Sequence, residues 1–596
     1  MVDKRIQGWL LIVISMITLF LGCLTIKSMS CEKTNDVHEA ITMQSPFRNM
    51  TAFIEVLHEK YPEINIEVIP YSGQNYTAYV KSQLTANDMP DIYCSTYYVP
   101  GREDVSDRLI DMSGYDFTDH YAEARLREVT DNGAIYMLPT YYDCIGITYN
   151  KTLLQEHGWK LPTSFRELEE LAPKVEEAGC QLAINQIQLP GYGFQYFCNI
   201  MSTNYLNTLD GRKWQNQFLD GGTTMKENDT LMESIKTLEK WRRIGMLSGG
   251  DPTSDDATRL QMAEGNTLFM LGGSNTFSED ETEDEFGLMP YLSEDGTQNA
   301  FILNVSRYMG LNKHLEDKGN EQKLTDALHV MEVLSTVKGM KALNKTYANT
   351  SLLPLKDYVV ESEGYYADIE SQINAGMTAP FIYDGWENVI VSTGKTMINF
   401  LCGDAELVDV VRSFDESQHL IADNTSAAYT TVTEKLDTSA CANVVGICFA
   451  KATGADLALI SKNKWYKLAE FKDLNFEGVS GALFPLPVTD QEITSILPTG
   501  WTGNIKTVTL RGKRIRELAE IGYDRNGDGK TFPYELVMPE HFVIDDDAIY
   551  TVAICGVTEA VAEEGNLTDT GILGLTAAED YFSQYDTFSL KDIVWK

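Results

Sequence analysis

One segment of the chain has the spacing of oxygen-bearing side chains that binds calcium. Residues 524–535 read DRNGDGKTFPYE and match the calcium-loop pattern D-x-[DN]-x-[DN]-G-x5-E. The expected metal ligands are Asp524, Asn526, Asp528, the carbonyl of Lys530 and bidentate Glu535. A helix predicted over 515–521 precedes the loop and a strand-like run follows it, so Ca²⁺ would act as a structural clip. The alternative is an ordinary Asn-Gly or Asp-Gly turn between a helix and a strand.

Cysteine and histidine, the other common metal ligands, are dispersed along the chain. None of the eight cysteines after Cys31 belongs to a CxxC pair, and most lie in apolar surroundings. This distribution argues against a zinc site and a disulfide framework and favours buried free thiols, with disulfide pairing left open. The eight histidines include no Gly-Asn-His and no His-x-His, whereas two-metal hydrolysis needs clustered His and Asp ligands.

The elements that position side chains alternate between helix and strand along residues 47–150. Apolar residues at helical spacing predict one helix over 47–57 and another over 76–84, and Ile64–Val68 alternates as a half-buried strand. Asp91–Cys94 is a second, shorter strand. Strands separated by helices indicate right-handed βαβ units and a parallel sheet. In such sheets ligands bind beyond the carboxyl ends of the strands.

A further helix is predicted over 162–178. Ser164 and Glu167 have the spacing of a capping box at its start, and a glycine follows its end. Pro173 lies inside this helix and predicts a kink or a break there.

Four segments together resemble a known family. KYPEINIEVIPYSGQNY, MPDIY, GAIYMLPTYYDCIGITYNKTLLQEHGW and LPTSFRELEELAPKVEEAG are similar to the extracellular solute-binding proteins of ABC importers, in the branch that mostly carries sugars. The resemblance extends over residues 41–420 in the order of the family. It implies two α/β lobes joined by hinge strands, with residues 181–290 in the second lobe, closing on a small solute without chemistry at that solute.

The resemblance implies that aromatic and polar side chains that follow strands contact the solute. Sugars present apolar ring faces edged by hydroxyls, so their sites combine aromatic rings with amides and carboxylates. The expected solute contacts are Trp386, Asp143, Tyr142, Tyr383, Asp384, Gln74, Tyr97 and Ser45. For each of them the alternative is packing at the rim of a sheet rather than contact with a solute.

The amino terminus indicates export. Lys4 and Arg5 precede an apolar run that ends in Phe20-Leu21-Gly22-Cys23, which resembles a bacterial lipobox with Cys23 as the acylated residue. Cleavage after Ser30 and an uncleaved anchor over 9–26 are the alternatives, and all three export the remaining chain. The formal net charge of -39 argues against a nucleic-acid partner, because it repels phosphate backbones.

The last third of the chain reads as a second module. The segments TGADLALI, VTDQEI, ILP and IKTVTLRGKRI occur in the order found in the carboxy-terminal domain of 5′-nucleotidases, which the resemblance places at residues 429–596. In that family the domain holds the nucleobase, and a separate metallophosphatase domain performs hydrolysis. Here Ser461-Lys462-Asn463-Lys464-Trp465 replaces the family's glycine-rich turn, and no metallophosphatase half is present.

The sequence therefore predicts an α/β, two-lobed periplasmic-binding-protein-like fold with a hinge, followed by a separate α+β domain. The expected divisions are a signal peptide or anchor (1–30), the solute-binding domain (31–422), a linker (423–428) and the 5′-nucleotidase C-terminal-like domain (429–596). The expected function is capture of a sugar or oligosaccharide at the outer face of the cell membrane and its delivery to an ABC permease, without enzymatic activity. The alternatives are a surface protein that binds or hydrolyses nucleotides through its last domain, and a receptor that senses rather than transports.

Overall fold

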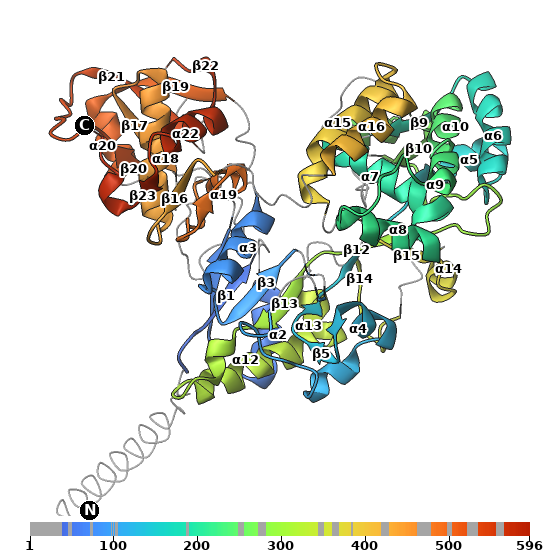
Figure 1. Cartoon of the computed structure of the whole chain (residues 1–596), viewed down its shortest axis with the longest axis horizontal. Helices are drawn as coiled ribbons and strands as arrows, with labels where there is room; N and C mark the ends of the chain where they lie inside the picture. Colours follow the sequence, from blue (N-terminus) through green and yellow to red (C-terminus); the bar gives the residue numbers. More distant parts are fainter. Residues whose placement is uncertain are drawn as a thin grey trace, which may run out of the picture.

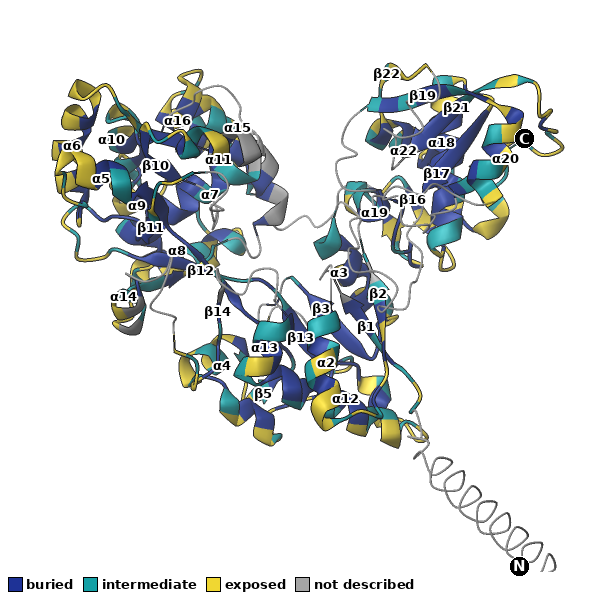
Figure 2. Ribbon diagram, turned by 180° about the vertical axis from the view of Figure 1, so that it is seen from behind, coloured by how far each residue is buried: buried dark blue, intermediate teal, exposed yellow. Residues whose placement is uncertain are grey.

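The computed structural model describes residues 38–595 with several internal gaps. The gaps are 46–49, 72–74, 97, 99, 102–104, 186–189, 248–254, 272–281, 344–350, 360–368, 383–385, 419–427, 462–477, 498–503, 521–533 and 556–565. Figure 1 shows three bodies: a first lobe at the bottom, a second lobe at the upper right, and the carboxy-terminal domain at the upper left. Each body has a buried interior (Figure 2), and Ala482 and Phe484 of the carboxy-terminal domain pack into that of the first lobe.

The first lobe is built on a five-stranded sheet of order β2-β1-β3-β13-β6. The strands β1, β2 and β3 run parallel, and β13 is antiparallel to both β3 and β6. Its strands are β1 (Ile41–Ser45), β2 (Ile66–Pro70), β3 (Ile92–Ser95), β6 (Leu138–Pro139) and β13 (Tyr308–Leu311). Its main helices are α2 (Thr51–Lys60), α3 (Tyr76–Ala86), α4 (Glu123–Val129), α12 (Glu321–Leu334) and α13 (Val337–Leu343). The helices and strands predicted within 47–94 are all present, with boundaries shifted by a few residues.

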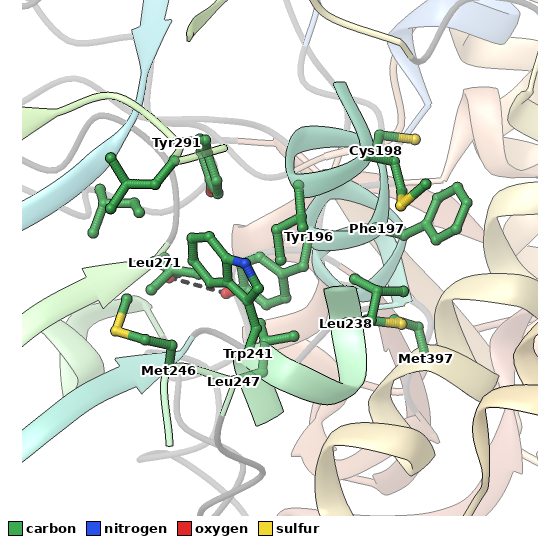
Figure 3. Close-up of a cluster of buried hydrophobic side chains, with 14 of the residues drawn as sticks. Tyr196, Phe197, Cys198, Leu238, Trp241, Met246, Leu247, Leu271, Tyr291 and Met397 are labelled. Carbon is green, nitrogen blue, oxygen red and sulfur yellow. Dashed lines mark hydrogen bonds between the residues drawn. The ribbon is translucent and has the colours of Figure 1, made fainter. Parts of the chain in front are cut away.

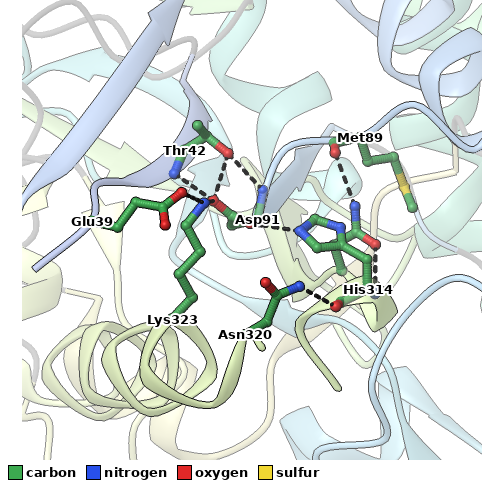
Figure 4. Close-up of polar contacts among 8 residues, drawn as sticks. Glu39, Thr42, Met89, Asp91, His314, Asn320 and Lys323 are labelled. Atoms are coloured by element: carbon green, nitrogen blue, oxygen red, sulfur yellow. Dashed lines mark hydrogen bonds and ion pairs between the residues drawn. The ribbon is translucent and has the colours of Figure 1, made fainter. Parts of the chain in front are cut away.

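A buried carboxylate fixes the end of this sheet at which β1 and β3 begin. Asp91 is 2% exposed and accepts hydrogen bonds from the backbone and hydroxyl of Thr42, both at 2.8 Å. His314 Nε2 lies 2.7 Å from the same carboxylate, and Lys323 Nζ lies 3.5 Å from it (Figure 4). Burial alone would raise the pKa of Asp91, but the bonds from His314 and Thr42 lower it to about 2.

The second lobe contains a four-stranded sheet of order β11-β8-β10-β9. Its strands are β8 (Ile147–Asn150), β9 (Gln181–Asn185), β10 (Thr267–Leu271) and β11 (Phe286–Met289). Its helices are α5 (Lys151–His157), α6 (Phe165–Glu177), α7 (Pro190–Met201), α8 (Leu209–Leu219), α9 (Asp229–Ser234), α10 (Thr237–Arg243), α11 (Asp255–Ala263), α15 (Glu387–Cys402) and α16 (Leu407–Ser417). Trp241 is at the centre of a fully buried aromatic core there (Figure 3). The predicted break at Pro173 is absent, because α6 runs through that residue.

The lobes are joined by a four-stranded sheet of order β14-β7-β12-β15. Its strands are β7 (Tyr142–Ile145), β12 (Phe301–Val305), β14 (Ser351–Leu352) and β15 (Thr378–Pro380). β7 connects β6 of the first lobe to β8 of the second, and β12 returns from β11 to β13. We call this sheet the hinge sheet. The predicted architecture of two α/β lobes with crossing strands is confirmed.

The carboxy-terminal domain has a five-stranded sheet of order β20-β17-β21-β19-β22. Its elements are β16 (Thr430–Val432), α18 (Thr438–Thr453), β17 (Leu457–Ser461), β18 (Pro487–Val488), α19 (Asp490–Ile496), β19 (Asn504–Arg511), α20 (Gly512–Glu520), β20 (Tyr534–Val537), β21 (Ile549–Cys555), β22 (Thr568–Leu573), α22 (Gly574–Phe582) and β23 (Thr587–Phe588). Successive residues of β17 enter two different cores, as expected for a central strand.

Candidate functional site

The candidate site lies where the first lobe meets the hinge sheet. β3 ends at Ser95, which pairs with Tyr308 at the start of β13, and Tyr308 also pairs with Pro139 at the end of β6. Residues that follow β3 and β6, or precede β13, therefore gather at one edge of the sheet. This edge also receives the carboxyl ends of β1 and β2, because both are parallel to β3 or to its neighbour.

Asp143 projects from β7 at this edge. Side chains alternate along a strand, so Asp143 and Tyr141 lie on the face opposite Tyr142 and Cys144. Tyr142 and Cys144 belong to the apolar core of the hinge sheet. Burial raises the pKa of Asp143 from 3.8 to about 6, even though the charge of Arg307 acts in the other direction. A carboxylate held at such a cost in stability is typical of a functional site.

Arg307 is the second charged group of the site and was not among the residues expected from the sequence. It occupies the short link between β12 and β13, where Thr140 N donates to its carbonyl at 2.9 Å. Its guanidinium lies 5.8 Å from the ring centroid of Tyr76, within the range of a cation–π contact. Its buried Nε has no hydrogen-bond partner among the described residues. The available signal was its charge, which is the only one in the segment 306–312.

Tyrosines surround these two charges. Tyr76 begins α3 and donates a hydrogen bond to the Cys94 carbonyl at 2.7 Å. Burial raises the pKa of Tyr141 to about 12, and a hydrogen bond to Ser306 and the charge of Arg307 partly oppose the shift. We call Tyr76, Tyr141, Asp143 and Arg307 the hinge cluster. It combines one cation, one carboxylate and two phenol rings, which can bind a polar molecule that also has apolar faces.

The structure places two of the predicted contacts in packed positions. Trp386 is 2% exposed and stacks on Phe218 with ring centroids 5.0 Å apart, inside the core of the second lobe. Its indole therefore offers no exposed face in this structure, because the helix that it precedes, α15, packs against α7. Tyr142 donates a hydrogen bond to Glu128 at 2.9 Å and lies on the face of β7 away from Asp143.

The remaining predicted residues lie mostly outside the described ranges. Tyr383, Asp384, Gln74 and Tyr97 lie outside the described residues, as does Cys23. Ser45 is the last residue of β1, paired with Pro70. Of the calcium loop, residues 524–533 lie outside the described part, and Glu535 accepts a hydrogen bond from Asn443 at 3.1 Å. Within the described ranges, no group of three or more His, Cys, Asp or Glu could hold a metal ion.

Two further features belong to the described part of the chain, namely its thiols and the length of its helices. The cysteines recorded as free thiols are Cys94, Cys144, Cys180, Cys198, Cys402, Cys441 and Cys448. None of the helices in the part of the chain that the structure describes has the length and apolarity needed to cross a bilayer.

Comparison with known proteins shows what the first half of the chain is similar to. Residues 42–328 match the family model described as bacterial extracellular solute-binding protein. Over 235 residues the chain is 20% identical to the maltodextrin-binding protein MdxE of Bacillus subtilis, a match that covers 39% of this chain and 54% of that relative. The chain thus spans about half the length of this relative.

Solved structures share the fold of the two lobes. A family 1 extracellular solute-binding protein from Bifidobacterium longum subsp. infantis has a TM-score of 0.52 and 19% identity, covering 64% of this chain and 99% of that one. RafE in complex with raffinose has a TM-score of 0.51 and 16% identity, covering 64% of this chain and 100% of that one. At these identities the likeness shows the fold, which is the two-lobed fold of periplasmic binding proteins.

Proposed function

We propose that this protein captures a sugar or oligosaccharide at the cell surface and delivers it to an ABC permease, without acting as an enzyme. The observation that carries the proposal is the hinge sheet, through which the chain crosses between two α/β lobes beside a charged and aromatic cluster. Two lobes joined in this way can close around a solute by hinge motion. The family match and the names of the relatives, a maltodextrin-binding protein and a raffinose complex, support a carbohydrate solute.

Asp143 and Arg307 are proposed as the polar solute contacts. The carboxylate would accept hydrogen bonds from sugar hydroxyls, and the guanidinium would donate to sugar oxygens, including through its buried Nε. Tyr76, which is partly exposed, would supply the aromatic face against which a sugar ring packs, while Tyr141 is buried in the ligand-free chain. Tyr383, Asp384, Gln74, Tyr97 and Ser45 remain proposed contacts from the sequence alone.

The other parts of the chain receive supporting roles in this proposal. Cys23 would be lipidated and would tether the protein to the membrane. Residues 429–596 would be an accessory domain of the 5′-nucleotidase C-terminal type, as the order of the similar sequence segments suggests. Asp524, Asn526, Asp528, Lys530 and Glu535 would bind Ca²⁺ as a structural clip within that domain.

The test is a calorimetric titration of the purified full chain with maltotriose, raffinose and adenosine, each with and without Ca²⁺. We expect a sugar to bind, and Arg307→Ala to weaken that binding by about tenfold to a hundredfold, because hydrogen bonds to a charged group contribute about 1.5–3 kcal/mol. Arg412→Ala is the control, since Arg412 pairs with Asp409 on the surface of the second lobe. Binding of adenosine alone, unaffected by Arg307→Ala, would instead assign the function to the last domain.

A further inference from the structure

The carboxy-terminal domain rests on the first lobe at the beginning of α3. α19 packs beside α3 (Figure 1), and Ala482 and Phe484 join the apolar core of the first lobe. Phe484 contacts Tyr79 of α3, with ring centroids 5.9 Å apart. An ion pair between Lys435 and Asp88, 2.7 Å apart, joins the two bodies just beyond the end of α3.

Three polar contacts of this interface lie on the segment that leads from β2 into α3. Tyr71 donates a hydrogen bond to the Ser495 carbonyl at 2.6 Å. Asn75 Nδ2 lies 2.7 Å from Gln491 Oε1 and 3.2 Å from Thr494 Oγ1. Both residues that flank the undescribed positions 72–74 are therefore hydrogen-bonded to the same short helix, α19.

Asn75 links this interface to the hinge cluster. Its Oδ1 accepts a hydrogen bond from Ala78 N at 3.0 Å and so caps α3, while its Nδ2 is held by α19. The next residue, Tyr76, lies against the Arg307 guanidinium. A displacement of α19 would therefore move the cap of α3 and, with it, the phenol ring on which Arg307 rests.

We propose that α19 of the carboxy-terminal domain positions the hinge cluster, so that solute affinity in the lobes depends on docking of that domain. The inference rests on the proposed function for its solute, but the positioning itself is a property of the ligand-free chain. Gln491, Thr494 and Ser495 are in this sense positioning residues, which act on the solute through Asn75 and Tyr76.

Two glycines of the carboxy-terminal domain provide a matched pair of variants. Gly481 has a φ of +74°, and a Cβ there would lie 2.8 Å from the Tyr79 ring and 3.3 Å from the Tyr71 ring. Gly454 has a φ of +70°, and a Cβ there would meet no atom within 4 Å. Alanine at either position carries the same left-handed backbone strain, but only Gly481→Ala forces the domain away from α3.

The first measurement is hydrogen–deuterium exchange of the ligand-free full chain. We expect faster exchange in peptides covering residues 76–80 and 306–309 in Gly481→Ala, and wild-type exchange in Gly454→Ala. Asn75→Ser keeps a capping side chain but is too short to reach α19, so the same peptides should exchange faster there too. Identical exchange of these peptides in Gly481→Ala and Gly454→Ala would overturn the positioning role, whether or not a sugar binds.

The second measurement is the affinity for whichever of maltotriose or raffinose the wild-type chain binds. We expect about tenfold weaker binding in Gly481→Ala and Asn75→Ser than in Gly454→Ala. A change of this size is typical of the coupling free energy between two linked sites. The pH below which binding weakens should also rise in the first two variants, because a displaced Arg307 no longer favours the Asp143 carboxylate. Wild-type affinity and pH profile in both variants would exclude the coupling, whereas failure of the wild-type chain to bind any sugar would count against the proposed function alone.

Discussion

Individual residues of this protein show opposite ways of holding a buried carboxylate. Asp91 has hydrogen bonds from Thr42 and His314, which lower its pKa to about 2, so the folded protein gains from its charge. Asp143 has burial without such compensation, and its pKa rises to about 6, so the folded protein pays for its charge at neutral pH. The first arrangement stabilises the sheet, and the second is the kind expected where a ligand is to supply the missing partners.

Removing the charge of Asp143 should stabilise the protein in a pH-dependent way. Since the folded-state pKa is about 6 against an ordinary 3.8, the contribution of this group to stability is present below pH 4 and is lost as the pH rises through 6. Asp143→Asn should therefore raise the free energy of unfolding by up to about 3 kcal/mol at pH 7.5 and by about 1 kcal/mol at pH 4.5. Urea denaturation at the two pH values measures this, and a variant less stable than wild type at pH 7.5 would contradict it.

Asp91→Asn should have the opposite effect. Because the folded-state pKa lies below 3.8, the stabilising contribution is present above pH 4 and disappears as the pH falls towards 2. We expect a loss of about 2–4 kcal/mol at pH 7, since the charge is buried and hydrogen-bonded. Sugar affinity should stay unchanged, as Asp91 precedes β3 at the end of the sheet away from Ser95. Thermal unfolding and calorimetric titration of the same variant check both statements.

At the scale of elements, the local sequence pattern predicted helices and strands better than it predicted the roles of side chains. Apolar periodicity was sufficient for α2, β2 and α3, because each of these elements buries one face against its sequence neighbours. The role of Trp386 could not be predicted in this way. Its burial depends on α7, about two hundred positions earlier in the chain, and on α8 and α16, whose rings surround it.

The hinge cluster was predictable only in part, for a related reason. Asp143 was among the predicted contacts because it follows an aromatic pair next to a strand. Arg307 was missed because the segment around it reads simply as a returning strand, and only the pairing of β13 with both β3 and β6 brings it to the same edge. Long-range strand pairing cannot be read from the periodicity of either strand alone.

Replacement of Trp386 distinguishes a core position from a solute contact. Trp386→Ala should lower the free energy of unfolding by about 3–5 kcal/mol, since a large buried ring leaves a cavity. Trp386→Phe should cost less and leave sugar affinity within twofold of wild type, because the position does not reach the solute. Chemical denaturation and calorimetric titration decide between the roles. Weaker binding by Trp386→Phe at unchanged stability would instead support the predicted solute contact.

The whole molecule consists of three bodies connected in different ways. The second lobe is joined to the first through the hinge sheet, whereas the carboxy-terminal domain shares an apolar core with the first lobe at Ala482 and Phe484. Motion of the lobes about the hinge would therefore carry the carboxy-terminal domain together with the first lobe.

This arrangement predicts how the protein unfolds. The carboxy-terminal domain and the first lobe should unfold as one cooperative unit and the second lobe as another, because shared cores couple stability. Scanning calorimetry should resolve these transitions. Gly481→Ala should separate the carboxy-terminal domain from its unit, and Gly454→Ala should not. Three transitions in the wild-type chain would contradict the prediction.

The path of β1 has a mechanical consequence. The described chain begins at His38, which is bonded to Asp326 of α12, and β1 then passes Asp91 and ends at Ser45 near the hinge. A force applied through a tether in residues 1–37 would enter the lobe beside the Asp326 carboxylate and then act along β1. There it would load the β1–β2 ladder in shear, a direction in which the hydrogen bonds share the force. The hinge cluster lies at the far end of this load path, so such a force would be spread over the sheet before it reaches the cluster.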